Sequence, residues 1–156
     1  MSKNHKIPSQ FCFSTHVIWS QVDANGHMRH SAYADIAAHA RVVALEKAGL
    51  SLKKFHEWHI GPVLLKEELV YFREVHLNDE LKVTCELQHT NEDISRWTIY
   101  EEIYRGDGIM AASVKVQGSW IDTQQRKMTG LQGEALEFFN RLPKSTDFKN
   151  VKKDNE

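Results

Sequence analysis

The chain has 156 residues, of which 41% are hydrophobic and 10% aromatic, enough apolar side chains for the core of one compact domain. Lysine and arginine number 20 against 21 aspartates and glutamates, so the chain has neither the basic excess of a nucleic-acid binder nor an acidic tail. The first residues contain no apolar run of signal-peptide length, and no segment approaches the roughly 18 apolar residues of a membrane span. We therefore expect a soluble, cytoplasmic protein without nucleic-acid or membrane partners.

The first third of the chain predicts a strand, a polar loop and a long helix. The segment 11–19, FCFSTHVIW, alternates between two faces and is rich in β-branched and aromatic residues, which is typical of a strand. The segment 31–50 repeats apolar residues, mostly alanine, at steps of three and four, which predicts one buried helix face. Ser31 is the expected N-cap, and Gly49 ends the pattern. The small alanine side chains would allow a sheet to curl closely around this helix.

The remainder predicts a short helix, four strands and a last short helix. The expected ranges are 51–58 for the first helix, 63–75, 80–90, 94–105 and 109–122 for the strands, and 133–142 for the last helix. Four strands joined by short turns predict an antiparallel sheet in meander order, with one face covered by the long helix. The expected fold class is α+β, a curved antiparallel sheet wrapped around one long central helix.

The domain organisation expected from these patterns is simple. We predict an N-terminal tail over residues 1–8, a single domain over 9–142 and a flexible, polar C-terminal tail over 143–156. Cys12 and Cys85 lie far apart in strand-like segments and fit no metal-binding or redox spacing. They are therefore expected to be small buried thiols of a protein in a reducing compartment.

The loop between the first strand and the long helix, VDANGHMRHSAY over residues 22–33, resembles the active-site loop of the hot-dog fold thioesterases. It is most similar to the acyl-CoA thioesterases of the 4-hydroxybenzoyl-CoA thioesterase type, whose loop reads roughly D-x-x-G-H-V-N-N-x-x-Y. Asp23, Gly26, His27 and Tyr33 match that pattern. The plant acyl-ACP thioesterases are also similar, since Asp23, Asn25 and His27 match their D-x-N-x-H spacing.

Two later segments extend the resemblance over about residues 11–122. LVYFREVHLNDEL resembles the family's long strand and the turn after it, and EEIYRGDGIMAASVKVQGSWID resembles its penultimate hairpin. The chain departs from the family in three places: Arg29-His30 replace the paired asparagines, Gln21 replaces an aspartate, and Glu74 replaces a proline. These departures concern the substrate and the detailed geometry more than the fold.

The resemblance implies an acyl-CoA thioesterase that hydrolyses a thioester to a free acid and a thiol. Asp23 would be the nucleophile or the general base, Asn25 and His27 would orient water or substrate, and the backbone N–H of His30 would polarise the thioester carbonyl at the helix start. The residues expected to bind substrate are Gly26, Tyr33, Arg73 and Arg96. No cofactor is expected apart from the coenzyme A of the substrate, and no metal.

Each candidate also has a structural interpretation. Asp23 could serve as a turn residue, His27 could hydrogen-bond the loop backbone, and Tyr33 could pack in the core. Arg73, Arg96 and Lys115 could lie on an ordinary solvated sheet surface instead of binding the phosphates of coenzyme A. The histidines His27, His30 and His39 are too scattered to predict a metal site.

Two further functions stay open from the sequence. A hot-dog hydratase or dehydratase is half supported, because Asp23 and Asn25 fit D-x-N-P-x-H but His27 comes one residue early. A non-catalytic acyl-CoA binding module is the other possibility. The resemblance implies a homodimer with sites at its interface, often assembled into a homotetramer. The acyl group, and whether its carrier is coenzyme A or acyl carrier protein, are not defined by these residues.

Overall fold

The structure is a computed structural model that describes residue 8 and residues 10–152. The helices are α1 (His30–Ala48), α2 (Leu52–Trp58), α3 (Gly133–Phe139) and the 3-10 turn η1 (Trp19–Gln21). The strands are β1 (Phe13–His16), β2 (Ile60–Tyr71), β3 (Glu80–Val83), β4 (Glu86–Asn91), β5 (Arg96–Arg105), β6 (Met110–Asp122), β7 (Lys127–Thr129) and β8 (Lys144–Val151). Apart from residue 8, the expected N-terminal tail lies outside the described residues.

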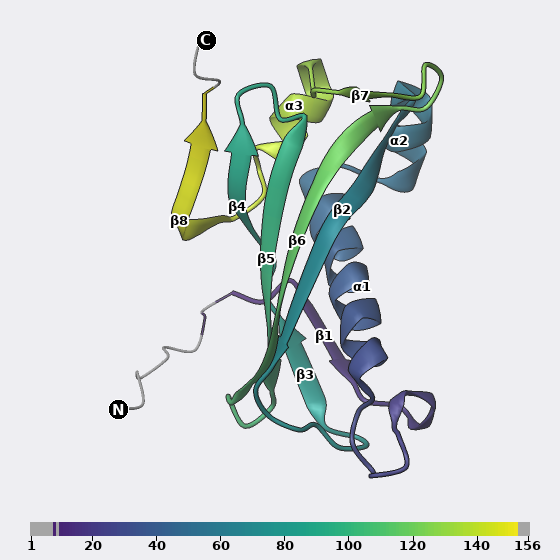
Figure 1. The fold of residues 1–156 in the computed structure, drawn as a ribbon, viewed down its shortest axis with the longest axis vertical. Helices are drawn as coiled ribbons and strands as arrows, with labels where there is room; N and C mark the ends of the chain where they lie inside the picture. Colours follow the sequence, from purple (N-terminus) through teal and green to yellow (C-terminus); the bar gives the residue numbers. More distant parts are fainter. Residues whose placement is uncertain (1–7, 9, 153–156) are drawn as a thin grey trace.

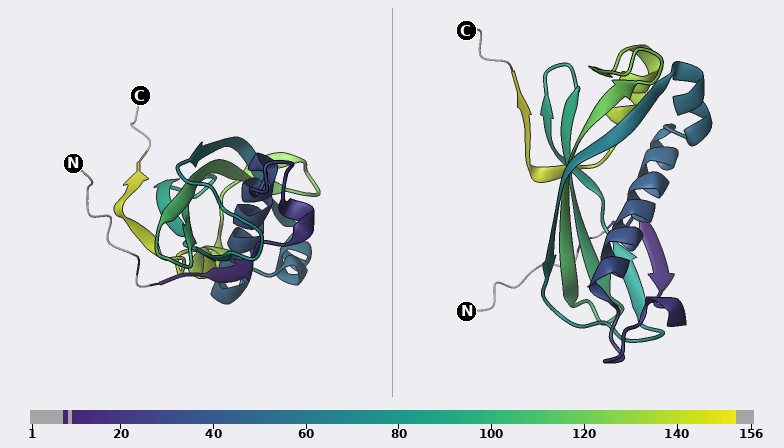
Figure 2. Two further views of the ribbon diagram at one scale, coloured as in Figure 1. Left: turned by 90° about the horizontal axis from the view of Figure 1, so that it is seen from below. Right: turned by 45° about the vertical axis from the view of Figure 1, so that its right-hand side comes forward.

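One curved sheet wraps around α1, which confirms the expected α+β hot-dog architecture (Figures 1 and 2). The strand order runs β1-β3-β5-β4-β8, and β6 pairs with β2, β5 and β7. The meander order expected from the sequence is wrong, because β2 pairs with β6 and not with the strand that follows it. The lengths of the strands account for this pairing, since only β6 can match the twelve residues of β2 along nearly their whole length.

The expected strand over 80–90 is two short strands, because the chain leaves the ladder at Thr84 and Cys85. The backbone N–H of Glu102 donates to the Thr84 hydroxyl at 2.9 Å, and the N–H of Thr84 donates to the Glu102 carbonyl at 3.0 Å. These bonds satisfy the polar groups at the break, so β3 and β4 both pair with β5. The break bends the sheet and brings Cys85 beneath α1.

The C-terminal segment differs from its expected state as a tail. Residues Lys144–Val151 form β8, which pairs in parallel with β4. The N–H of Leu87 donates to the Pro143 carbonyl at 2.7 Å, and Phe148 packs against the core. The strand lies at the edge of the sheet and is mostly polar, so its sequence lacks the alternation of apolar residues that marks a buried strand.

A stripe of alanines on α1 forms the contact with the inner face of the sheet. The buried alanines, none more than 6% exposed, are Ala32, Ala37, Ala40, Ala44 and Ala48. Larger side chains fill the wider space towards the other end of the sheet, where the rings of Phe55, Trp97 and Phe139 surround Trp120. The helix therefore lies close to the sheet, as its composition predicts.

One buried polar pair interrupts this apolar contact. Arg41 of α1 donates to Glu101 of β5 at 2.8 Å, and the two residues are 8% and 0% exposed. The second oxygen of Glu101 has no hydrogen-bond partner among the described residues. Burial raises the pKa of Glu101 to about 8, and Arg41 offsets only part of this effect.

This raised pKa predicts a pH-dependent stability. Between the ordinary pKa of 4.5 and about 8, folded protein holds the Glu101 proton and unfolded protein releases it. The unfolding free energy should therefore fall as pH rises through this window, by at most about 1.4 kcal/mol per pH unit. Urea unfolding from pH 5 to 8 should show this decline, and Glu101→Gln should remove it. An identical pH dependence in the Gln variant would contradict the assignment.

Candidate functional site

Residues 22–28 form a tight hairpin directly before α1. An isolated antiparallel bridge joins Val22 to Met28, and the N–H of Asp23 donates to the His27 carbonyl at 2.9 Å. The N–H of Gly26 donates to the Asp23 carbonyl at 3.0 Å, and Gly26 has a φ of 76°, in the left-handed region that favours glycine. A Cβ at Gly26 would meet nothing within 4 Å, so the turn requires glycine for its backbone conformation and not for space.

The Asp23 carboxylate is held by its own turn. Its Oδ1 accepts the backbone N–H of Asn25 at 2.8 Å and that of His27 at 3.3 Å. No hydrogen bond to Oδ2 exists within the described part of the chain, and the residue is exposed. The turn role considered from the sequence is therefore present in the structure, and it orients the carboxylate while leaving one oxygen open to a ligand or water.

The start of α1 has no side-chain cap. The N-cap residue is Arg29, whose side chain cannot accept a hydrogen bond, and Ser31, the cap expected from the sequence, lies inside the first turn. The Ser31 hydroxyl instead accepts from Nε of Arg29 at 2.9 Å. Because the first N–H groups of a helix have no intrahelical acceptor, those of His30 and Ser31 are available to a ligand beside the Asp23 hairpin.

Arg29 fixes the position of this helix start. Its backbone N–H donates to the Gln21 carbonyl at 2.8 Å, and its guanidinium donates to the Ser20 carbonyl of η1. These bonds tie η1 to the first turn of α1. Arg29, which stands where the resembled family has an asparagine, is thus held by hydrogen bonds to the carbonyls of Ser20 and Gln21.

The end of β2 packs against the same helix start. The Tyr71 hydroxyl donates to the His30 carbonyl at 3.3 Å, and the rings of Tyr33 and Tyr71 meet edge to face at 5.2 Å. Tyr33 is 4% exposed, so the packing role proposed for it from the sequence is confirmed. Burial raises the pKa of Tyr33, and the neighbouring Tyr71 and Glu74 add to the effect.

His27 joins the hairpin to a second polar cluster that the sequence did not reveal. It forms a bridge with His76, and the two rings lie 4.9 Å apart at 83°. The N–H of His76 donates to the Asp79 carboxylate at 2.8 Å. His76 and Asp79 line a pocket of about 440 Å³ together with Glu74, Glu80, Arg105, Gly106 and Asp107. The sequence indicates the two turns of this pocket, at Asn78-Asp79 and at Gly106-Asp107, but not that they lie together.

Arg105 organises the far wall of this pocket. Its guanidinium donates to the Glu74 carbonyl at 3.0 Å and to the Asp107 carboxylate at 2.6 Å. The pKa of Glu74 is lowered by its own backbone N–H and, to a smaller extent, by Arg105, His27 and His76. The pocket therefore contains both signs of charge next to His27.

The two arginines proposed for substrate binding lie beside the end of β2 and at the start of β5, and these two strand ends are at opposite ends of the sheet (Figure 1). Arg73 follows β2 close to Tyr71, and its guanidinium donates to the Phe72 carbonyl at 2.7 Å. Arg96 begins β5 opposite Ser119, at the end of the sheet away from the hairpin. The chain thus has Asp23, His27 and Arg73 at the same end of the sheet as the start of α1, and Arg96 at the other end.

Residues 8 and 10–152 contain no group of three or more histidine, cysteine, aspartate or glutamate side chains placed to hold a metal ion. No helix within the same ranges is long and apolar enough to cross a membrane.

Comparisons with known proteins identify a family for this fold. The model of the thioesterase-like superfamily matches residues 17–148. A hypothetical protein from Staphylococcus aureus, solved in complex with CoA, is 22% identical, with a TM-score of 0.76 over 88% of this chain and 89% of that one. A 1,4-dihydroxy-2-naphthoyl-CoA thioesterase from Synechocystis is 19% identical, with a TM-score of 0.74 over 85% and 96%. At these identities the structures establish the fold. No curated protein sequence matches the chain.

The backbone of Gly26 gives a test of the hairpin geometry. Gly26→Ala forces an L-residue into the left-handed region and should lower the unfolding free energy by about 1 kcal/mol. Gly26→Asn is the matched control and should cost less, because asparagine tolerates this conformation. Urea unfolding of both variants measures the difference. An alanine variant as stable as the wild type would contradict the observed turn.

Proposed function

The chain belongs to the thioesterase-like superfamily, and from this premise we propose that it is an acyl-CoA thioesterase whose active site is the start of α1 beside the Asp23 hairpin. The reaction adds water to the thioester carbonyl and releases a free acid and the thiol of coenzyme A. The observation that carries the proposal is the helix N-terminus without a side-chain cap, next to a carboxylate with one open oxygen.

The helix start supplies the electrophilic half of the chemistry. The N–H groups of His30 and Ser31 would donate to the thioester carbonyl oxygen, and the positive end of the helix dipole would stabilise the charge that develops there. A single oxyanion donor of this kind contributes about 3 kcal/mol to transition-state stabilisation. An aspartate or serine N-cap would occupy one of these donors, so the arginine cap keeps them open to the substrate.

Asp23 supplies the nucleophilic half. With Oδ1 held by two backbone N–H groups, Oδ2 can either attack the carbonyl carbon or take a proton from an attacking water. In both routes the carbon–sulfur bond breaks, and the thiolate takes up a proton. After direct attack the acyl group is held as an anhydride on Asp23, and water then cleaves this anhydride to release the acid and regenerate the carboxylate. Asn25 and His27, which lie in the same turn, would orient the water or the substrate.

Replacement of Asp23 tests the proposal. Asp23→Asn keeps an acceptor for the turn but removes the charge, so thiol release from acyl-CoA substrates should fall about 100-fold or more, a loss of about 3 kcal/mol. Asp147→Asn is the matched control, because the exposed Asp147 carboxylate also accepts two hydrogen bonds, from Ser145 at 2.6 Å and Gln88 at 3.3 Å, on the edge strand β8. A panel of aromatic, short-chain and long-chain acyl-CoA thioesters measures both variants.

The outcomes separate the proposed enzyme from the other functions considered. Equal turnover by wild type and Asp23→Asn would remove Asp23 from the mechanism. Binding of an acyl-CoA without thiol release would favour the non-catalytic module. Conversion of an enoyl-CoA without thiol release would favour the hydratase.

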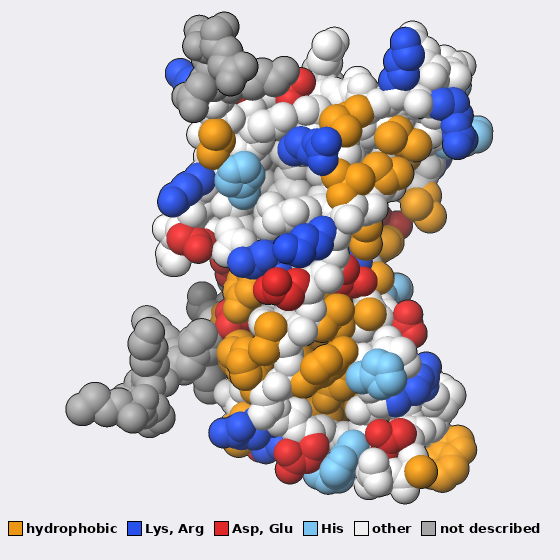
Figure 3. Space-filling model, in the orientation of Figure 1, with side chains coloured by type: hydrophobic (Ala, Val, Ile, Leu, Met, Phe, Trp, Pro, Cys, Tyr) orange, Lys and Arg blue, Asp and Glu red, His pale blue; other side chains and the backbone are white. Residues whose placement is uncertain are grey.

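We also propose that the protein forms a homodimer through β2. In the described part of the chain β2 pairs only with β6, so its other edge presents a row of unpaired backbone groups. Several apolar residues along and just after it are exposed, from 40% to 51%: Leu64, Leu65, Val70, Tyr71 and Phe72. Figure 3 shows hydrophobic side chains above and below a belt of charged side chains on the face where β2 runs. Pairing of two such edges would cover both the backbone and the apolar groups.

Antiparallel pairing of two β2 strands would also complete the site. In such a pair, a two-fold axis relates the two β2 strands, which run in opposite directions. The end of the sheet where β5 begins in one protomer therefore lies beside the end with the start of α1 in the other. The Arg96 end of one protomer would then approach the Asp23 hairpin of its partner, which gives Arg96 a place near the phosphates of coenzyme A. The separation of Arg73 and Arg96 within one protomer is consistent with such a shared site.

A charged residue at the β2 edge should disrupt this dimer. Leu64→Glu places a carboxylate in the proposed interface and should give a monomer with reduced turnover. Leu52→Glu is the control, because Leu52 is 69% exposed on α2 and lies outside the interface. Sedimentation velocity reports the mass of both variants. A dimer unaffected by Leu64→Glu would show that this edge is not the contact.

A further inference from the structure

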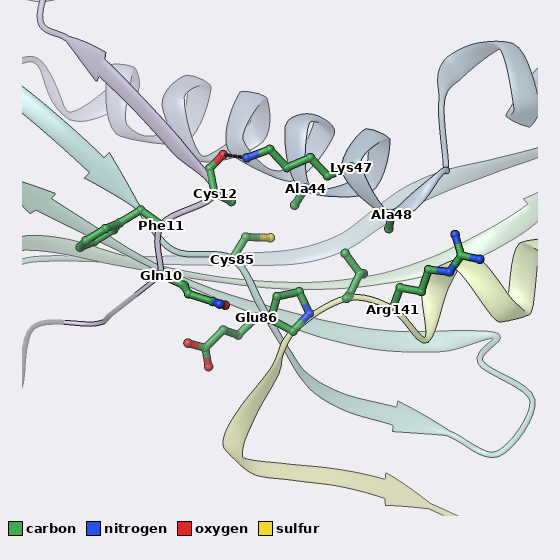
Figure 4. Close-up of a pocket in the computed structure, with 11 residues that line it drawn as sticks. Gln10, Phe11, Cys12, Ala44, Lys47, Ala48, Cys85, Glu86 and Arg141 are labelled. Atoms are coloured by element: carbon green, nitrogen blue, oxygen red, sulfur yellow. Dashed lines mark hydrogen bonds between the residues drawn. The ribbon is translucent and has the colours of Figure 1, made fainter.

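Cys12 and Cys85 meet on the wall of a pocket away from the Asp23 hairpin. The pocket has a volume of about 550 Å³ and lies between the segment before β1, the second half of α1 and the break between β3 and β4 (Figure 4). Ala44, Lys47 and Ala48 line its helix side, and Arg141 lies at its far end. The mechanism proposed above uses neither cysteine, and the chain contains no other.

The contacts of Cys12 hold its thiol beneath α1. The N–H of Cys12 donates to the Val83 carbonyl at 2.9 Å, which extends the β1–β3 ladder by one residue. The Cys12 thiol donates to the Ala40 carbonyl at 3.7 Å, and Cys85 lines the same pocket. Nζ of Lys47 donates to the Cys12 carbonyl at 2.8 Å, which brings a positive charge to the same residue.

We propose that Cys12 and Cys85 are an oxidisable dithiol site, in which Cys12 reacts with a hydroperoxide and Cys85 resolves the product as an intramolecular disulfide. The proposal stands on the meeting of the two thiols at one pocket, on the half-buried position of Cys12 and on the buried position of its partner. It does not depend on the thioesterase activity.

The surroundings give the two thiols different roles. The neighbouring Cys85 thiol lowers the pKa of Cys12, and Lys47 lowers it further against the effect of burial. The neighbouring Cys12 thiol and burial raise the pKa of Cys85 well above its ordinary value. Since the thiolate is the nucleophile, Cys12 should react first, while Cys85 keeps its proton until the second step.

The chemistry balances with a hydroperoxide as the oxidant. The Cys12 thiolate attacks one oxygen of the peroxide, the O–O bond breaks, and a sulfenic acid forms as the peroxide is reduced to water or an alcohol. The Cys85 sulfur then attacks Sγ of the sulfenic acid, the S–OH bond breaks, and water leaves with the Cys85 proton. The disulfide would join the segment before β1 to the β3–β4 break.

The experiment treats the folded protein with hydrogen peroxide and analyses it by non-reducing peptide mapping. The wild type should yield one cross-linked peptide pair that contains both cysteines and separates on reduction with dithiothreitol. Cys85→Ser should accumulate a sulfenic acid at Cys12 that dimedone traps, and Cys12→Ser should react about ten-fold more slowly. The double variant Cys12→Ser/Cys85→Ser is the control and should give neither product.

The peptide map of the wild type tests the cross-link without any substitution. A sulfinic acid at Cys12 with Cys85 unchanged, or a disulfide between two molecules, would overturn the proposal. Equal rates for the two single variants would overturn the assigned roles. Thermal unfolding before and after oxidation gives an independent readout, because a disulfide that closes a long loop should raise the midpoint and dithiothreitol should reverse the shift.

Discussion

The close contact between α1 and the curved sheet is the constraint on which the other features depend. A stripe of alanines, each almost fully buried, allows the strands to bend closely around the helix. The same closeness brings Arg41 against Glu101 and the thiol of Cys12 against the Ala40 carbonyl. Larger side chains on this face would push the helix away and separate all of these groups.

Because α1 is held against the sheet, its first turn lies at the end of the sheet where the substrate is proposed to bind. Arg29, which ties the helix to η1, cannot cap it, so the first N–H donors are left for a ligand. The Asp23 hairpin is equally fixed, because two backbone donors occupy one oxygen of its carboxylate. Electrostatic stabilisation of an oxyanion requires donors that are oriented before the reaction, and the fixed helix start meets this requirement.

The sequence predicts those features that depend on local patterns. The alanine periodicity predicts α1 and its end at Gly49, and the motif around Asp23 predicts where the polar loop lies. The sequence does not predict features that depend on strand register or on the curvature of the sheet. The meeting of Cys12 with Cys85 follows from the break between β3 and β4, and β8 has too few apolar residues to show a strand pattern. The pocket that contains His76, Asp79 and Arg105, and the distance of Arg96 from the Asp23 hairpin, likewise depend on which strands pair.

The central claim is that the start of α1 polarises the carbonyl of a bound thioester. The most direct test is isotope-edited infrared spectroscopy of an acyl-CoA labelled with ¹³C at its carbonyl and bound to the Asp23→Asn variant, which should bind without hydrolysing it. Hydrogen bonds from the His30 and Ser31 N–H groups would weaken the C=O bond, so the carbonyl stretch should move to lower frequency than in water. A bound carbonyl whose frequency equals or exceeds that in water would contradict the account.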